Sequence, residues 1–218
     1  MTSASHFSLL VVDDEPDLRT LYELTLLREG YDVETAGTVE EALLHLKDRT
    51  YSAVITDMRL PDGTGLDLLR KLEETGRREK AIVITAYGSA ENAVEALKVK
   101  HVIVCGHYEC GGIRAAMADV DLGLANNWLR NIKEVYNMRA VELEEIGSPK
   151  ERERMMVEFN VMEQVRNLAK TSIIQKAWKK RQIEIHGWVV DLGSGYIKEL
   201  PIKLDEAKDL EPIFRYKL

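Results

Sequence analysis

The chain has 218 residues, of which 45% are hydrophobic and 31% charged, and this composition excludes a disordered or low-complexity protein. Its formal net charge of −7 argues against a nucleic-acid-binding surface. No apolar run approaches the ~18–20 residues of a membrane span, and the N-terminus lacks the basic start of a signal peptide. We therefore expect a cytoplasmic protein with neither nucleic acid nor membrane as a partner. The only two cysteines, Cys105 and Cys110, exclude a disulfide framework.

Short apolar runs alternate with amphipathic stretches through the first hundred residues. The apolar runs predict four strands, at residues 9–12, 31–34, 53–56 and 81–84. The other stretches carry apolar residues at helical spacing and predict helices at residues 17–29, 39–48, 65–75 and 89–98. Strands that alternate with helices of this length are typical of βαβ units. We therefore expect an α/β fold with a parallel, doubly wound sheet of the flavodoxin-like kind.

The second half of the chain differs in pattern and in charge. It predicts a strand at 101–106, helices at 111–120, 126–139 and 150–181, a polar loop at 142–153, and two strands at 183–191 and 195–200. Residues 1–98 carry a net charge of −8, whereas residues 99–218 carry +1. We therefore expect two domains, 1–98 and 99–218. One composite sheet, in which the later strands extend the first sheet, is an alternative arrangement.

Three acidic residues and a threonine follow the expected strands of the first part. Asp13 and Asp14 come directly after the first strand, Asp57 ends the third, and Thr85 follows the fourth. Because the chemistry of parallel sheets gathers at the carboxyl ends of their strands, we expect these side chains to share one cleft. Clustered carboxylates repel one another unless a hard divalent cation joins them, and Mg²⁺ is the usual choice. Solvated loop acids are the alternative interpretation.

The sequence around these acids resembles the receiver domain of two-component response regulators over residues 8–98. The stretches that carry the resemblance are Leu10-Val11-Val12-Asp13-Asp14-Glu15, Thr56-Asp57-Met58-Arg59-Leu60-Pro61-Asp62-Gly63-Thr64-Gly65 and Ile84-Thr85-Ala86-Tyr87-Gly88. The resemblance implies that Asp57 is the phosphoacceptor and Thr85 the switch hydroxyl. It implies a Mg²⁺ site made by Asp13, Asp14, Asp57 and the backbone carbonyl of Arg59. It also implies a histidine kinase or a small phosphodonor as the partner.

One position departs from the receiver pattern. The family expects a lysine followed by proline at the end of a fifth strand, and counting from Ala96-Leu97-Lys98 places His107 there. An imidazole with an unperturbed pKa of about 6.5 is a poor substitute for a permanent cation. We therefore expect phosphorylation of this chain to be impaired.

A histidine and a cysteine lie three residues apart where the strand at 101–106 passes into a helix. His107 and Cys110, followed by two glycines, can bind one metal ion of the zinc type. A buried cysteine and a hydrogen-bonded histidine are the alternative interpretation. Cys105 is a candidate third ligand, because it lies on the same side of the strand as His107. We expect His186 to be a packed strand histidine rather than a ligand.

Residues 97–200 resemble the C-terminal half of a β-class carbonic anhydrase. The resemblance rests on residues 102–112, 121–129, 160–165, 170–178 and 186–189, followed by Asp191. It implies that His107 and Cys110 are zinc ligands and that the site lies at a homodimer interface. The family's earlier Cys-x-Asp-Ser-Arg motif is absent, since no cysteine precedes Cys105. A zinc-hydroxide mechanism needs three protein ligands and an open position, so we expect weak or no hydration of CO₂.

The two resemblances meet near residues 96–100, and we therefore interpret the chain as a chimera of two α/β families. Three functional hypotheses follow from this interpretation. The chain is a receiver-like phosphoacceptor module, or a zinc-dependent carbonic anhydrase, or a fold-recombination product without a selected activity. The acidic site has the more complete set of ligands. The phosphoacceptor hypothesis therefore ranks first, and the balance is against an enzyme.

Overall fold

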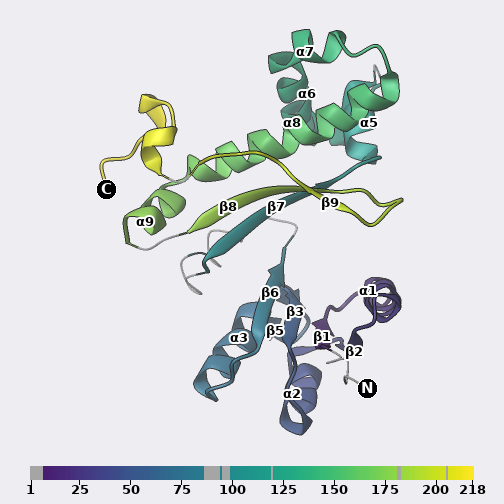
Figure 1. The fold of residues 1–218 in the computed structure, drawn as a ribbon, viewed down its shortest axis with the longest axis vertical. Coiled ribbons are helices and arrows are strands. Elements are labelled where there is room, and N and C mark those ends of the chain that lie inside the picture. The colour runs from purple at the N-terminus through teal and green to yellow at the C-terminus, as the bar shows by residue number, and fades with distance from the viewer. Residues whose placement is uncertain (1–6, 86–93, 95–98, 119, 181–182, 205) are drawn as a thin grey trace, which may run out of the picture. The chain divides into compact units, whose positions relative to one another are not determined.

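The chain forms two compact units, Met1–Ala93 and Val94–Leu218 (Figure 1). The computed structural model describes residues 7–85, 94, 99–118, 120–180, 183–204 and 206–218. The sequence predicts a domain boundary after residue 98, and this boundary remains a prediction. None of the helices in the described ranges combines the length and the apolar character that a membrane span requires.

The first unit is a parallel four-stranded sheet with helices between its strands. Its strands are in the order β2-β1-β3-β6, and every neighbouring pair runs parallel. The strands are β1 (Ser8–Val12), β2 (Asp32–Ala36), β3 (Ala53–Asp57) and β6 (Lys80–Ile84), and the helices are α1 (Pro16–Arg28), α2 (Val39–Asp48) and α3 (Gly65–Glu74). These elements confirm the α/β fold and the expected parallel sheet. Of the helix expected at 89–98, only Val94 belongs to the described residues.

Local sequence signals mark where the helices of the first unit begin. The Thr38 hydroxyl accepts a hydrogen bond from the Glu41 amide at the start of α2. Thr64 and Asp67 form a reciprocal capping box at the start of α3. A short hairpin that the sequence pattern does not predict, β4 (Arg59–Leu60) with β5 (Gly63–Thr64), leads into α3. The chain between β3 and α3 is therefore tightly hydrogen-bonded.

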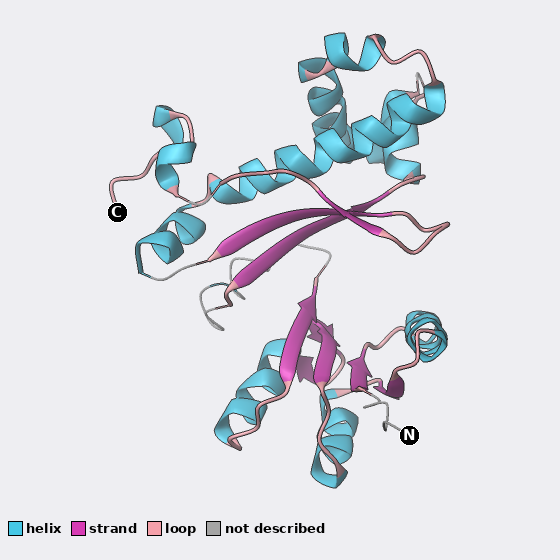
Figure 2. Cartoon of the chain, in the orientation of Figure 1, coloured by secondary structure: helices cyan, strands magenta, loops and turns pink. Residues whose placement is uncertain are grey.

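The second unit is a three-stranded sheet covered by a long helix. Strand β7 (His101–His107) pairs in parallel with β8 (Glu184–Val190), which pairs antiparallel with β9 (Ile197–Glu199). The helices are α5 (Gly111–Met117), α6 (Asn126–Met138), α7 (Ala140–Glu144), α8 (Pro149–Ala169) and α9 (Ser172–Lys180), with short 3₁₀ turns at Gly123–Ala125, Ala207–Asp209 and Pro212–Phe214. Figure 2 shows α8 lying along one face of β7 and β8. These strands lie where the sequence predicts them.

Two expectations for the helices of the second unit were wrong in detail. The polar stretch expected as a loop from residue 142 contains the end of the short helix α7. The single helix expected over 150–181 is broken into α8 and α9. The Thr171 hydroxyl donates to the Leu168 carbonyl at 2.8 Å and accepts from the Ile174 amide at 3.5 Å. Thr171 therefore ends one helix and caps the next, because a hydroxyl satisfies backbone groups that a continuous helix would pair.

The alternative of one composite sheet was also wrong for the strands that the structure describes. Strand β7 pairs with β8 over all seven of its residues, whereas β6 pairs with β3. A Cβ atom on Gly106 would lie 2.6 Å from Val161 of α8, and one on Gly187 would lie 2.7 Å from Ile202. Close packing of this kind requires matched partners. Strand β7 finds both its hydrogen-bonding partner and its packing partners within the second unit.

Candidate functional site

The acidic residues of the first unit lie at the carboxyl edge of its sheet. Asp13 follows β1 and is buried, whereas Asp14 beside it is exposed. The parallel register pairs Val12 with Thr56, which brings Asp13 level with Asp57 on the neighbouring strand. Asp57 in turn pairs with Ile84 of β6, so the half-buried Thr85 follows one residue beyond it. The sheet thus places Asp13, Asp57 and Thr85 at the ends of three adjacent strands.

Backbone amides hold the two central carboxylates of this edge. The Glu15 amide donates to Oδ1 of Asp13 at 2.9 Å, and the Arg59 amide donates to Oδ2 of Asp57 at 2.8 Å. Each of these bonds uses one oxygen of its carboxylate, and the other oxygen can also accept a ligand. This hydrogen bond keeps the backbone of Arg59 next to the Asp57 carboxylate.

Tyr22 of α1 reports a negative field at the same edge. Burial raises the pKa of its phenol, and the negative charges of Asp13, Asp57 and Glu15 raise that pKa further. The sequence analysis did not identify Tyr22, although an aromatic with a polar tip on the helix after an acidic pair is a usable signal. A negative field of this kind favours a bound cation.

The donor set at this edge has the chemistry that Mg²⁺ prefers. Mg²⁺ takes oxygen ligands, keeps several waters and usually binds through one or two carboxylates. Among the described residues, three ligand atoms of His, Cys, Asp or Glu side chains lie within 4.8 Å of one another in the second unit. Asp13, Asp14 and Asp57 do not form such a group. Asp13 and Asp57 with waters fit a hydrated Mg²⁺ better than a cage of three carboxylates does.

The second predicted pair, His107 and Cys110, lies where β7 turns into α5. The Nδ1 atom of His107 lies 3.0 Å from the Tyr108 carbonyl. Since a carbonyl only accepts hydrogen bonds, Nδ1 carries the proton and Nε2 of the neutral ring has the free lone pair. Cys110 immediately precedes α5, and Glu109 between them has a φ of 61° that sharpens the turn. His107 is therefore in the tautomer that binds metals through Nε2.

These two residues do not make a complete zinc site. A zinc site with catalytic chemistry needs three protein ligands. Among the described residues, no third His, Cys, Asp or Glu joins His107 and Cys110 in a group with ligand atoms within 4.8 Å. Cys105 is a poor candidate, because partial burial raises the pKa of its thiol and zinc binds the thiolate. The residues present therefore do not fit a carbonic-anhydrase zinc centre.

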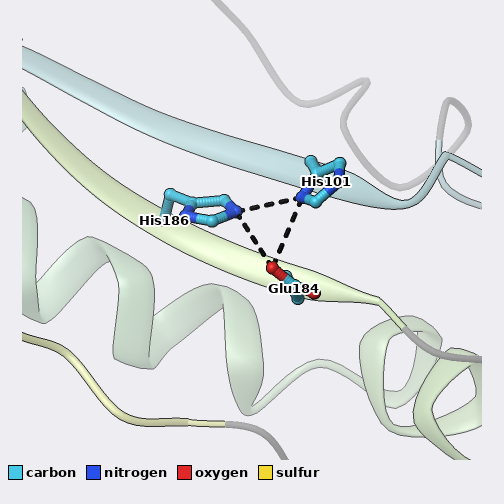
Figure 3. A group of neighbouring side chains, drawn as sticks. All are labelled: His101, Glu184 and His186. Carbon is cyan, nitrogen blue, oxygen red and sulfur yellow. Dashed lines mark hydrogen bonds and ion pairs between the residues drawn. The ribbon is translucent and has the colours of Figure 1, made fainter.

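A different group of ligand-type side chains gathers at the opposite end of β7. His101 is directly opposite Glu184 in the parallel register, and His186 lies two residues further along β8. Figure 3 shows the three side chains pointing toward one another. This cluster is not apparent from the sequence, from which we expect His186 to be a packed strand histidine. The spacing of Glu184 and His186 puts both on one face of a strand. Their contact with His101 depends on the register between two strands that lie about eighty residues apart in the chain.

Comparison with known families matches the two parts of the chain to two different families. Residues 79–197 match the family described as carbonic anhydrase. Residues 9–103 match the response regulator receiver domain. The two matches overlap over residues 79–103, which include β6 and the first residues of β7. The chain is therefore a chimera of the two families, as the sequence resemblances predict.

Individual relatives resemble one half of the chain each. A carbonic anhydrase from Emericella nidulans is 47% identical over 111 residues, which are 50% of this chain and 49% of that protein. The response regulator protein PilR from Pseudomonas aeruginosa is 46% identical over 89 residues, 41% of this chain and 20% of that protein. The chain thus spans about half of the first relative and a fifth of the second. A tetrameric β-carbonic anhydrase from Sordaria macrospora aligns with 85% of this chain and 94% of its own at 24% identity and a TM-score of 0.55, which shows a similar fold alone.

Proposed function

We propose that this chain, which belongs to the carbonic anhydrase family over residues 79–197 and carries a receiver domain over residues 9–103, acts as a Mg²⁺-dependent phosphoacceptor. Asp57 is the acceptor, and a histidine kinase or a small phosphodonor is the partner. The observation that carries this proposal is the strand register that brings Asp13, Asp57 and Thr85 to adjacent strand ends. In the part of the carbonic-anhydrase half that the structure describes, His107 and Cys110 gain no third ligand of this kind.

The residues at this edge divide the work of phosphoryl transfer. A carboxylate oxygen of Asp57 attacks the phosphorus of the donor in line, and the bond from phosphorus to the donor's leaving group breaks. When bound, Mg²⁺ offsets the negative charge on the transferred phosphoryl group. Asp13 and the Arg59 carbonyl are the further oxygen ligands that we assign to it, and Asp14 contributes through one of the waters that Mg²⁺ keeps. The Thr85 hydroxyl is the switch group that contacts the phosphoryl oxygen.

Among the described strands, the first sheet has no fifth strand to carry the receiver lysine, since β7 with His107 at its end belongs to the other sheet, and this lowers the expected yield of the modified state. His107 ends β7 and pairs with Val190 of β8, so the second unit fixes its backbone. A neutral imidazole gives no permanent positive charge beside an acyl phosphate. We therefore assign this chain a weak switch. The tetrameric relative supports the further proposal that the carbonic-anhydrase-like half associates with a second copy of itself.

Acetyl phosphate with Mg²⁺ is expected to add one phosphoryl group to the wild-type chain and none to Asp57→Asn. The asparagine keeps the hydrogen bond from the Arg59 amide, so the fold is retained while the nucleophile is lost. Intact-mass spectrometry and a phosphate-affinity gel measure the adduct. Asp48→Asn, an equal charge change on the exposed end of α2, is the matched control and keeps the adduct. An adduct of equal size on Asp57→Asn, or none on wild type, contradicts the proposal.

The hydration of CO₂ by the zinc-loaded chain is expected to stay at the rate of buffer with free zinc. Two ligands at His107 and Cys110 do not hold the ion firmly while it acidifies a water molecule. A stopped-flow indicator assay measures the rate, and Cys110→Ser is the control, whose rate should equal that of the wild type. A wild-type rate well above that of buffer with free zinc, lost in Cys110→Ser, would contradict this expectation and show that a third ligand completes the site at His107 and Cys110.

A further inference from the structure

The His101, Glu184 and His186 cluster has the spacing of metal ligands. Nδ1 of His101 lies 3.1 Å from Nε2 of His186 and 3.6 Å from Oε2 of Glu184, and these last two atoms are 3.8 Å apart. A circle through three points with these separations has a radius of about 2.0 Å, which is the length of a zinc–nitrogen or zinc–oxygen bond. An ion at its centre is therefore at bonding distance from all three atoms without any change of rotamer.

A second layer of hydrogen bonding prepares His186 to bind a cation. Its Nδ1 lies 2.8 Å from Oε1 of Glu199 on β9. Since an ionised carboxylate only accepts, Nδ1 carries the proton and the Nε2 lone pair faces His101 and Glu184. A carboxylate behind a histidine in this way orients metal-binding imidazoles and makes them more basic.

Charge and access also suit a small divalent cation. Glu184 places a negative charge beside two histidines, and the three side chains are open enough for an ion to enter, with His101 57% and His186 22% exposed. Two imidazoles and one carboxylate form a ligand set that zinc accepts, and hard cations such as Mg²⁺ prefer oxygen alone.

We propose that His101, Glu184 and His186 form a Zn²⁺ site with one coordination position open to water. This site is separate from His107 and Cys110, because His101 and His107 are the first and last residues of β7. A seven-residue strand separates its ends by roughly 20 Å. The ion ties the beginning of β7 to the beginning of β8, and so stabilises the sheet of the second unit.

Calorimetric titration with ZnCl₂ alone tests the site in the full chain after treatment with a chelator. The background variant is His107→Asn/Cys110→Ser, which removes the other candidate ligands. We expect this variant to bind one Zn²⁺ per chain and both His101→Asn and His186→Asn in the same background to bind at least 100-fold more weakly. Glu199→Gln should weaken zinc binding by about 10- to 100-fold, because it removes the carboxylate that orients His186. His45→Asn, a histidine of the first unit paired with Glu34, is the matched control and leaves binding unchanged.

Two further readouts separate loss of the ligand from loss of the fold. Zn²⁺ should raise the thermal midpoint of tryptophan fluorescence in the background variant and not in His101→Asn, because ligands that bind the folded state stabilise it. Co²⁺ should give visible d–d bands without a thiolate charge-transfer band. Zinc binding that survives His101→Asn and His186→Asn overturns the proposal. So does zinc binding that is lost in the His107→Asn/Cys110→Ser background, since the ion would then be bound through sulfur.

Discussion

Gly65→Ala is expected to destabilise the first unit by about 3 kcal/mol, because overpacking a dense site typically costs this much. A Cβ atom at Gly65 would lie 2.4 Å from the carbonyl oxygen of Asp57 and 3.0 Å from the Thr56 side chain. Neither group moves easily. Thr56 is fully buried, and its hydroxyl donates to the same Asp57 carbonyl at 2.9 Å. The backbone that carries the phosphoacceptor must therefore shift, and the yield of the acetyl phosphate adduct should fall with the stability.

The measurement must report on the first unit alone. All three tryptophans, Trp128, Trp178 and Trp188, lie in the second half of the sequence, so their fluorescence follows the other unit. Hydrogen exchange of β1 and β3 peptides in a urea series gives the free energy of opening the first unit. Gly63→Ala is the matched control, since its Cβ would meet only Val39 at 3.4 Å and Asp67 at 3.6 Å. Equal protection of β3 in Gly65→Ala and Gly63→Ala would contradict this packing argument.

Arg77→Met is expected to cost a similar amount, about 3 kcal/mol, through a buried polar network. The guanidinium donates to the Leu46 carbonyl at 2.5 Å, to the Arg49 carbonyl at 2.9 Å and to the carboxylate of Glu79. The Glu79 side chain is only 3% exposed. Removing Arg77 leaves that charge without its partner and two carbonyls at the end of α2 without their donor, and both losses are costly. Arg70→Met is the control, since its exposed pair with Asp67 contributes under about 0.5 kcal/mol.

The same pair gives the stability of the first unit a defined pH dependence. Burial by itself raises the pKa of the Glu79 carboxyl, but the hydrogen bonds and charge of Arg77, together with backbone hydrogen bonds at Glu79 and Tyr51, outweigh it and hold the pKa below its usual range. A group with a lowered folded-state pKa stabilises the fold above its unfolded pKa of about 4.3 and loses that contribution as pH falls through the folded pKa. The difference in opening free energy between wild type and Arg77→Met should therefore shrink below about pH 4. A difference that stays constant from pH 7 to pH 3 would show that Glu79 does not titrate with the pair.

The secondary structure was predictable because its signals are local. Residues 39–48 were expected to be a helix from their apolar spacing, and α2 has those bounds. The strand expected at 81–84 differs from β6 by one residue. Thr171 shows the limit of such signals. A threonine in a long amphipathic stretch is compatible with an unbroken helix, and its hydroxyl ends α8 only because the chain folds back there.

The candidate sites were predictable to different degrees. Asp13 and Asp57 each end an apolar run, so a parallel sheet of the expected order brings them level, and the register of β1 and β3 agrees. The group of His101, Glu184 and His186 has no such signal, because no local pattern states that β7 pairs with β8 or in which register. A shift of one residue would put His101 opposite Ile185 instead of Glu184, so its side chain would no longer share a face with Glu184 and His186.

The amino-acid sequence by itself determined that this chain joins two families, that acidic residues follow its first and third strands, and that no cysteine precedes Cys105. These are properties of composition and order along the chain. Only the tertiary structure decided that the strands of the two halves form separate sheets and that two histidines and a glutamate meet on β7 and β8. The physical reason is that strand pairing and register depend on packing between distant segments, such as α8 against Gly106.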